Sequence, residues 1–530
     1  MARYSNVLSL EALSLAQWLI ASVAIGSLLF FPVYAIYNLY FHPLAHIPGP
    51  FWARASGIPS WRHARTGKRH IWLWQQFETY GNRIRCNVRR SPFYTAFQRN
   101  KHEKTTLNVI DIAEHAAKRK LLNMAFTDKT TRAASEFMTR HVDRWNELLL
   151  TGNNKGFESD WTAPVDMSEK LDTLVFDIMG DLCFGRSFDI KEPDVKNPLR
   201  AVPHNMAEYM KFYYPICRSP FLDLLLWLKP CGLDAFFDFV TPPAVQQYNK
   251  FVRENITSRI ALHAAEQESS MPESDRRQDI FYFLAGARDP VTGAAVYKEN
   301  DLRAESSLLI IAGSDTTSVS LSGIFFYLTA NQRCLLKLTA EIRTAFPSAE
   351  DIVYGPKLLG CQYLRACVDE GMRLTPSGPC ELPREVMDGG ILIKGEYYPP
   401  VTIVATVPWV DSRNRHVYGD DADIFRPERW IVDEAHGVTK DSVRRARDGF
   451  HPFLSGPGNC VGKNVAMAEM LITLARTLHR MDVRRAPGST VGGGGPEEGW
   501  GATDPGQFQL FDAYISLRKG PEVQFRKRID

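Results

Sequence analysis

A glycine-rich loop that carries one cysteine, Phe453–Gly462, constrains the fold of this chain more than any other segment. It reads Phe-Leu-Ser-Gly-Pro-Gly-Asn-Cys-Val-Gly and leads into an apolar segment that predicts a helix from about Lys463. The thiol of Cys460 would face the N–H groups and the positive end of that helix, which favours thiolate over thiol. The glycines let the loop turn tightly and lie flat against a planar ligand. The loop therefore predicts either a thiolate ligand for the metal of a planar cofactor or a buried structural cysteine.

A second unusual segment, Ala312–Thr317, lies in the middle of an apolar stretch that predicts a long helix from about Asp301 to Gln332. It reads Ala-Gly-Ser-Asp-Thr-Thr. Glycine costs a helix about 1 kcal/mol relative to alanine, and Ser and Thr side chains compete for backbone hydrogen bonds. A local opening of the helix, in which O₂ and water lie, would explain this composition. The alternative is that these residues only cap or kink the helix.

Together the two segments resemble the cysteine loop and the oxygen-activating helix of the cytochrome P450 family of haem-thiolate monooxygenases. The resemblance covers nearly the whole chain, from about Pro48 to the end. It implies a mainly α fold with a small β-sheet region, preceded by one N-terminal transmembrane helix, and haem b as the cofactor. It makes Cys460 the proximal iron ligand, with Phe453 beside the haem. It assigns Thr316 and Asp315 to proton delivery during oxygen activation.

Basic residues elsewhere in the chain match the family positions that hold the haem propionates. His115 and Arg119 are four residues apart and would share one face of a helix. Two donors on one face suit a carboxylate, although a solvated basic pair is the alternative for these residues taken alone. The resemblance adds Arg384 as a third propionate ligand. The family usually has an arginine where this chain has Gly458, and we expect Arg119 and Arg384 to compensate for its loss.

Three charged residues match a structural network of the family. Glu370 and Arg373 are three apart and adjacent on a predicted helix, and Arg429 lies in the segment Phe-Arg-Pro-Glu-Arg-Trp. Alone, the first two would be an ordinary surface pair. The resemblance places all three in a buried network that supports the scaffold and the retention of haem.

Several segments predict smaller features of the fold. Apolar residues from about Leu171 to Phe188 have helical spacing and predict a core helix. Residues 212–216 and 221–228 predict core packing, or by resemblance a lid that contacts the membrane. The segment Gly492–Gly499 predicts a flexible surface loop. Short strands are predicted in four places: Leu382–Val386, Gly390–Pro400, Phe508–Ser516 and Gly520–Phe525.

The N-terminal part predicts a membrane anchor. No charged residue occurs from Ala12 to Ile36, a length that spans a bilayer core of about 30 Å, although a buried core helix is the alternative. One arginine precedes this segment and several basic residues follow it, so we expect the body of the protein in the cytosol. The expected organisation is a lumenal N-terminus (1–11), a transmembrane anchor (12–36), a proline-rich hinge (37–50) and a catalytic domain (51–530). This predicts a single-pass protein of the endoplasmic reticulum membrane.

Charge and cysteine content restrict the partners. The net charge of +3 over 530 residues gives no support for nucleic-acid binding. The nine cysteines are dispersed without a disulfide framework, which is typical of a reducing compartment. The resemblance implies a monomer that takes O₂, a small lipophilic substrate and electrons from NADPH through a separate reductase. That reductase would dock by charge on four basic residues, Lys440, Arg444, Arg445 and Arg447.

The sequence therefore predicts a monooxygenase that hydroxylates or otherwise oxidises a lipophilic compound. The hinge and the C-terminal tail resemble the filamentous-fungal branch, which suggests secondary metabolism or detoxification. One alternative is a haem-thiolate isomerase or dehydratase that works without a reductase, but Asp315 and Thr316 argue against it. Another is an inactive, haem-poor binding protein. Two departures from the family suggest it, namely Gly458 and a chain that is shorter than the family pattern between Arg85 and Asn87.

Overall fold

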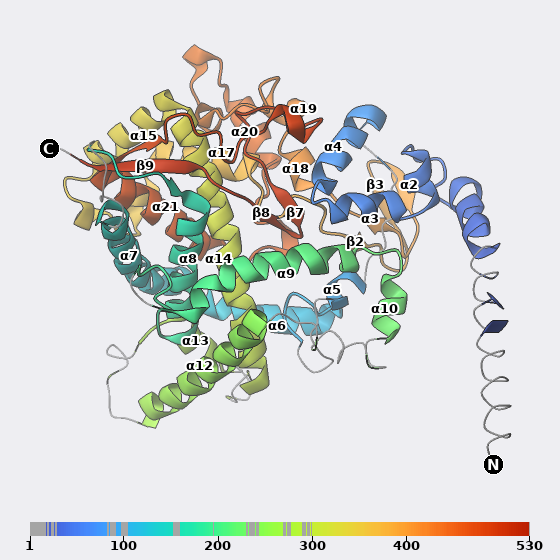
Figure 1. Cartoon of the computed structure of the whole chain (residues 1–530), viewed down its shortest axis with the longest axis horizontal. Helices are drawn as coiled ribbons and strands as arrows, with labels where there is room; N and C mark the ends of the chain where they lie inside the picture. The colour runs from blue at the N-terminus through green and yellow to red at the C-terminus, as the bar shows by residue number, and fades with distance from the viewer. Residues whose placement is uncertain are drawn as a thin grey trace, which may run out of the picture.

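The computed structural model describes residues 29–81, 92–96, 104–151, 160–193, 196–228, 243–268, 277–288 and 299–528, with a few isolated residues between and before these ranges. Helices account for most of the described chain (Figure 1). The longer helices are α4 (Arg69–Tyr80), α6 (Ile112–Ala125), α7 (Asp128–Thr151), α8 (Met167–Phe184), α9 (Val202–Cys217), α12 (Pro243–Glu268), α14 (Glu299–Ala330), α15 (Gln332–Ala345), α17 (Gln362–Leu374) and α21 (Lys463–Arg480). Shorter helices include α2 (Phe51–Ala55), α3 (Ile58–Arg65), α5 (Pro92–Ala96), α10 (Leu222–Leu228), α13 (Ile280–Ala285), α18 (Pro408–Asp411), α19 (Arg415–Tyr418) and α20 (Lys440–Asp448).

Helix α14 forms the centre of the molecule (Figure 1). It packs most extensively against α8 and also contacts α17 and α21, while α21 packs against α7. Leu321, Ile324 and Phe325 of α14 are buried, as are Leu174 and Ile178 of α8. Each such side chain stabilises the fold by about 1.5–3 kcal/mol. The core therefore fixes α14 relative to the helices around it.

Polar caps set the ends of the helices that position the site. The side chain of Asp166 accepts a hydrogen bond of 2.8 Å from the N–H of Ser168 and starts α8. That helix ends before Gly185, whose φ of 75° is left-handed and favours glycine. The side chain of Asp111 accepts from the N–H of Glu114 at 2.7 Å and starts α6. This cap fixes the helix that carries the predicted basic pair.

The strands form small antiparallel sheets. Strand β9 (Glu522–Lys527) lies between β1 (Val165–Asp166) and β6 (Met481–Arg485), with Val523 opposite both Val165 and Arg485. The other pairs are β2 (Arg384–Glu385) with β5 (Ile403–Val404), β3 (Ile391–Ile393) with β4 (Glu396–Tyr398), and β7 (Phe511–Ala513) with β8 (Ile515–Leu517). The prediction of a mainly α fold with small sheets is confirmed.

The loop predicted at Gly492–Gly499 is exposed in its second half, whereas its first four residues, the glycines at 492–495, are packed against the chain. The N–H of Gly494 donates to the carbonyl of Asp504 at 3.0 Å, and that of Gly495 donates to Ala502 at 3.1 Å. A Cβ on Gly494 would lie 2.3 Å from the carbonyl oxygen of Ala502. Glycine is therefore needed here because two backbone segments pass too close for a side chain. Composition alone could not distinguish this packing from flexibility.

The predicted opening of the long helix is also not observed. Helix α14 continues without a break through Ala312–Thr317. The hydroxyl of Thr316 donates to the carbonyl of Ala312, one turn earlier, at 2.8 Å. Such a bond competes locally with the backbone and bends a helix more often than it breaks it.

Within the part of the chain described here, α14 is the one helix long and apolar enough to cross a membrane. Its most apolar window has a mean hydropathy of 1.4 and is 67% buried inside the protein, so α14 is a core helix. A shorter apolar helix spans Leu29–Phe41. About half of the predicted anchor at 12–36 lies outside the described residues, so the anchor stays a prediction.

Candidate active site

The cysteine loop closes on itself just before α21. The N–H of Cys460 donates to the carbonyl of Phe453 at 2.8 Å, and that of Asn459 donates to Gly456 at 3.1 Å. A short 3₁₀ turn, Gly456–Gly458, lies between these bonds. Cys460 is exposed, and α21 begins three residues later at Lys463, as predicted. The loop therefore presents the thiol next to the N-terminus of a buried helix.

The protein alone does not hold Cys460 as a thiolate. Desolvation by neighbouring protein atoms raises the pKa of the thiol, although Cys460 as a residue is exposed. The backbone N–H of Gly462 and the charge of Arg119 act in the opposite direction and lower that pKa. The predicted effect of the helix terminus is therefore outweighed by burial. Coordination to a metal ion would deprotonate the thiol outright.

Arg119 of α6 holds the cysteine loop from the neighbouring helix. Its Nη1 donates to the carbonyl oxygen of Asn459, and its Nη2 donates to the Oδ1 of the same residue at 2.5 Å. Its Nε donates to Asn123 at 2.9 Å. This contact joins residues 340 positions apart in the sequence and places a guanidinium beside Cys460.

Two more basic side chains lie close to Arg119. Burial, and then the charges of Arg119 and Arg384, lower the pKa of His115. The Nη1 of Arg384 donates to the Tyr94 hydroxyl at 2.9 Å. Its Nη2 lies 3.5 Å from the place that a Cβ would take on Gly458. Arg384 thus lies beside the position at which the family arginine is absent.

These residues fit a haem. The thiol of Cys460 is a soft donor of the kind that binds haem iron. Within the described chain, no carboxylate lies at ion-pair distance from His115, Arg119 or Arg384. Cations that gather without carboxylate partners suit the two propionates of a haem. Cys460 would bind the iron, and the three basic residues would hold the propionates.

Asp315 and Thr316 lie on α14, which also packs against α21. Both side chains are partly exposed, in contrast to Ser314, Thr317 and the residues that follow, which are buried. Burial, and then the charge of Asp172, raise the pKa of the Asp315 carboxyl to about 7, against the opposing charge of Arg518. Asp315 can therefore gain and lose a proton near neutral pH.

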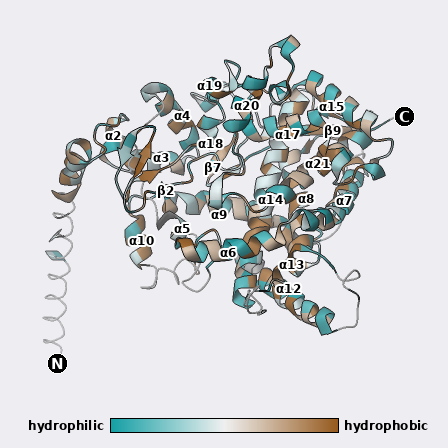
Figure 2. Cartoon of the chain, turned by 180° about the vertical axis from the view of Figure 1, so that it is seen from behind, coloured by the Kyte–Doolittle hydropathy of each residue, from teal (hydrophilic) through white to brown (hydrophobic). Residues whose placement is uncertain are grey.

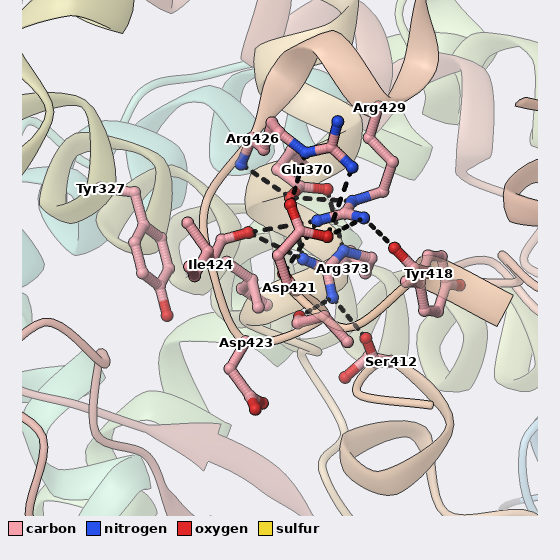
Figure 3. Close-up of polar contacts among 12 residues, drawn as sticks. Tyr327, Glu370, Arg373, Ser412, Tyr418, Asp421, Asp423, Ile424, Arg426 and Arg429 are labelled. Carbon is pink, nitrogen blue, oxygen red and sulfur yellow. Dashed lines mark hydrogen bonds and ion pairs between the residues drawn. The ribbon is translucent and has the colours of Figure 1, made fainter. Parts of the chain in front are cut away.

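The predicted network of Glu370, Arg373 and Arg429 is formed and buried (Figure 3). Arg373 donates to both carboxylate oxygens of Glu370 at 2.8 Å. The Nε of Arg429 donates to Glu370 at 3.4 Å, and its Nη1 donates to Asp421 at 3.0 Å. Trp430 adds a bond to Glu370 at 3.0 Å. These contacts join α17 to the segment before α20, which agrees with a role in the scaffold.

Sequence reasoning missed three members of the site and its support. Asn459 accepts hydrogen bonds from Arg119, and its position next to Cys460 in the sequence could have indicated a role in the site. Asp421 pairs with Arg429, but it lies outside the recognisable motif. Arg518 contacts α14 from the C-terminal part of the chain, and nothing in its local sequence indicates this. The short segment after Arg85 lies mostly outside the described residues, so its effect on the pocket stays a prediction.

Comparisons with known proteins agree with this geometry. A family model described as cytochrome P450 matches residues 79–492. The cytochrome P450 monooxygenase fscF of Fusarium equiseti is 31% identical over 519 residues, which cover 93% of this chain and 94% of the relative. The cytochrome P450 monooxygenase apf7 of Gibberella fujikuroi is 33% identical over 535 residues, which cover 94% of this chain and 96% of the relative. The cytochrome P450 monooxygenase AKT7 of Alternaria alternata is 30% identical over 520 residues.

A cysteine loop bound by the guanidinium of Arg119, with His115 and Arg384 close by, agrees with the haem-thiolate class of enzymes. The match of the family model spans most of the chain, and the relatives cover almost all of it. The chain therefore belongs to the cytochrome P450 family and is a monooxygenase of that family.

Proposed function

We propose that this protein transfers one oxygen atom from O₂ to a small lipophilic substrate, by hydroxylation or a related oxidation. Haem b would be bound through Cys460, and NADPH would supply electrons through a separate reductase. The observation that carries the proposal is the arrangement at the cysteine loop, where Arg119 binds Asn459, the residue next to Cys460. When bound, haem supplies the oxygen and one-electron chemistry that side chains lack.

The residues of α14 would deliver protons. The carboxyl of Asp315 has a pKa of about 7, so it exists in both forms near neutral pH, which suits a general acid. The hydroxyl of Thr316 donates to Ala312 and keeps its lone pairs free to accept another proton. A proton could thus pass from solvent through Asp315 to Thr316 and then to the reacting oxygen.

Exposed apolar surface at one end of the molecule supports the proposals of a lipophilic substrate and a membrane location. Helix α10, the β3–β4 hairpin and the N-terminal apolar helix lie on the same side (Figures 1 and 2). Trp227 of α10 and Leu392 of β3 are 67% and 69% exposed. The rings of Phe31 and Phe221 contact edge to face, with centroids 6.4 Å apart, which ties the N-terminal helix to the start of α10. Exposed apolar surface of this kind is typical of a membrane contact.

A role in secondary metabolism or detoxification is the finer part of the proposal. It is supported by the fungal relatives from Fusarium, Gibberella and Alternaria, which are cytochrome P450 monooxygenases. We propose the endoplasmic reticulum membrane as the location, with the catalytic part in the cytosol and the protein as a monomer.

The test is the absorption spectrum of the purified, reduced full-length protein with carbon monoxide. A strongly red-shifted Soret band that Cys460→Ser abolishes is expected, because a thiolate opposite carbon monoxide produces that shift. Oxidation of a lipophilic substrate should then require both O₂ and reductase. A Soret band at the position of histidine ligation, or product formed without reductase, would contradict the proposal.

A further inference from the structure

Arg518, which follows β8, joins the proton-delivery helix α14 to α8. Its side chain is 5% exposed and forms an ion pair with Asp172 of α8, whose side chain is 25% exposed. The guanidinium also donates to the hydroxyl of Ser318 at 2.7 Å and to that of Ser322 at 3.3 Å. Ser318 in turn donates to Asp172 at 2.6 Å. The result is a closed polar cluster between α8, α14 and the end of β8.

This cluster lies on the face of α14 that carries Asp315. Ser318 is three residues after Asp315, and Ser322 follows four residues later, so the three residues share one side of the helix. The hydroxyl of Ser318 also lies 3.3 Å from the backbone carbonyl of Asp315. Arg518 and Asp172 therefore place one positive and one negative charge next to the turn that carries Asp315.

We propose that Asp172 and Arg518 are positioning residues that set the proton affinity of Asp315 by acting in opposite directions. The inference rests on the proposed role of Asp315 in proton delivery. A nearby carboxylate disfavours ionisation of Asp315, and a nearby guanidinium favours it. Neither residue needs to touch the substrate or the cofactor. The balance between their charges decides the pH at which Asp315 releases its proton.

Other charged groups around α14 face different residues. Glu469 of α21 accepts a hydrogen bond from Thr317. Glu370 of α17 is held in its network with Arg373 and Arg429. Lys118 of α6 pairs with Asp301, near the start of α14. Burial and the charge of Asp172 raise the pKa of Asp315, and the charge of Arg518 lowers it.

The direct test is infrared difference spectroscopy of the full-length protein during a pH titration. The C=O stretching band of the protonated carboxyl that Asp315→Asn removes is assigned to Asp315, and its midpoint is expected near pH 7. Asp172→Asn should lower that midpoint, because it removes the like charge and leaves Arg518. Arg518→Gln should raise it, because it removes the opposing charge and leaves Asp172.

Charge-conserving variants are the matched controls. Asp172→Glu and Arg518→Lys disturb the geometry of the cluster but keep both charges, so the midpoint should stay close to that of the parent. Each single neutral variant leaves a partner charge without its ion pair, which can destabilise the fold. The double variant with Asp172→Asn and Arg518→Gln removes both charges together and should give a midpoint between those of the single variants.

The outcomes separate this inference from the proposed function. Equal midpoints in all variants, or shifts in the same direction, would overturn the inference, because a merely structural cluster would not move the midpoint in opposite directions. In a second measurement, the coupling between NADPH use and product formation is followed as a function of pH. If the midpoints shift in opposite directions but this pH profile does not change, Asp172 and Arg518 do tune Asp315, but Asp315 does not deliver protons. Opposite shifts that the coupling profile follows would support both.

Discussion

Replacing Arg373 with methionine should strongly destabilise the protein. The Arg373 side chain has no exposed surface and donates to both oxygens of Glu370 at 2.8 Å. It also donates to the carbonyl oxygens of Ser412 and, at 2.6 Å, of Ala422. Methionine fills similar volume but has no donor. The variant would leave the fully buried carboxylate of Glu370 with Arg429, the Trp430 indole and one backbone N–H.

The expected loss follows from this burial. Breaking a buried ion pair by removing one partner costs about 3–5 kcal/mol. Unfolding entropy is roughly 2.1 cal/mol/K per residue, or about 1.1 kcal/mol/K for a chain of this length. The midpoint of thermal unfolding should therefore fall by about 3–5 °C. We also expect earlier loss of haem on heating, because α17 lies against both α14 and α21.

The assay is thermal unfolding of the detergent-solubilised, haem-loaded protein, followed by circular dichroism and by the Soret band. Arg365→Gln on the same helix is the matched control. Arg365 pairs with Asp369 at 2.9 Å, but its side chain is 45% exposed. Exposed pairs contribute about 0.2–1 kcal/mol, so the control should shift the midpoint by at most about 1 °C. An Arg373→Met shift no larger than this would refute the assignment of Arg373 to a stabilising buried network.

Four further outcomes are expected. Arg384→Ala should lower haem occupancy, measured as the ratio of Soret to protein absorbance, and an unchanged ratio would exclude a propionate role. Thr316→Ala should divert electrons from product to hydrogen peroxide, and tight coupling in that variant would contradict its assignment. Burial raises the pKa of Glu469 to about 8, so the folded state favours the neutral carboxyl. The stability of the protein should therefore fall as the pH rises from about 4 to 8. Glu469→Gln should reduce this pH dependence, measured by thermal unfolding at several pH values. Neutralising the basic residues of α20 should slow reductase-dependent turnover more at low salt than at high salt, and equal slowing would argue against docking by charge.

Local patterns in the sequence predicted several of the helices and the pairing of neighbouring charged residues on one of them. The spacing of Glu370 and Arg373 places both on one helix face, and the structure pairs them. The apolar segment after Cys460 likewise forms α21 from the predicted residue. These predictions succeed because the interacting groups lie within one or two helical turns.

Contacts between distant segments could not be predicted in this way. The ion pair between Arg518 and Asp172 joins residues 346 positions apart, and neither residue lies in a recognisable motif. The packing of Gly494 against Ala502 requires a particular path of the backbone, which composition does not encode. The thiol of Cys460 is another case, since its pKa depends on desolvation and on the charge of Arg119, which lies outside the loop. Tertiary packing decides each of these features.

Glu370 and Asp315 show how packing gives two carboxyl groups opposite pKa shifts. Desolvation acts to raise the pKa of both carboxyl groups. For Glu370, the charges of Arg373 and Arg429 outweigh burial and lower the pKa, so the side chain stays ionised and holds the scaffold together. For Asp315, the neighbouring charge of Asp172 adds to burial, and Arg518 offsets it only in part. The carboxylate with strong cationic partners is thus fixed in one state, and the carboxyl without them can exchange a proton near neutral pH.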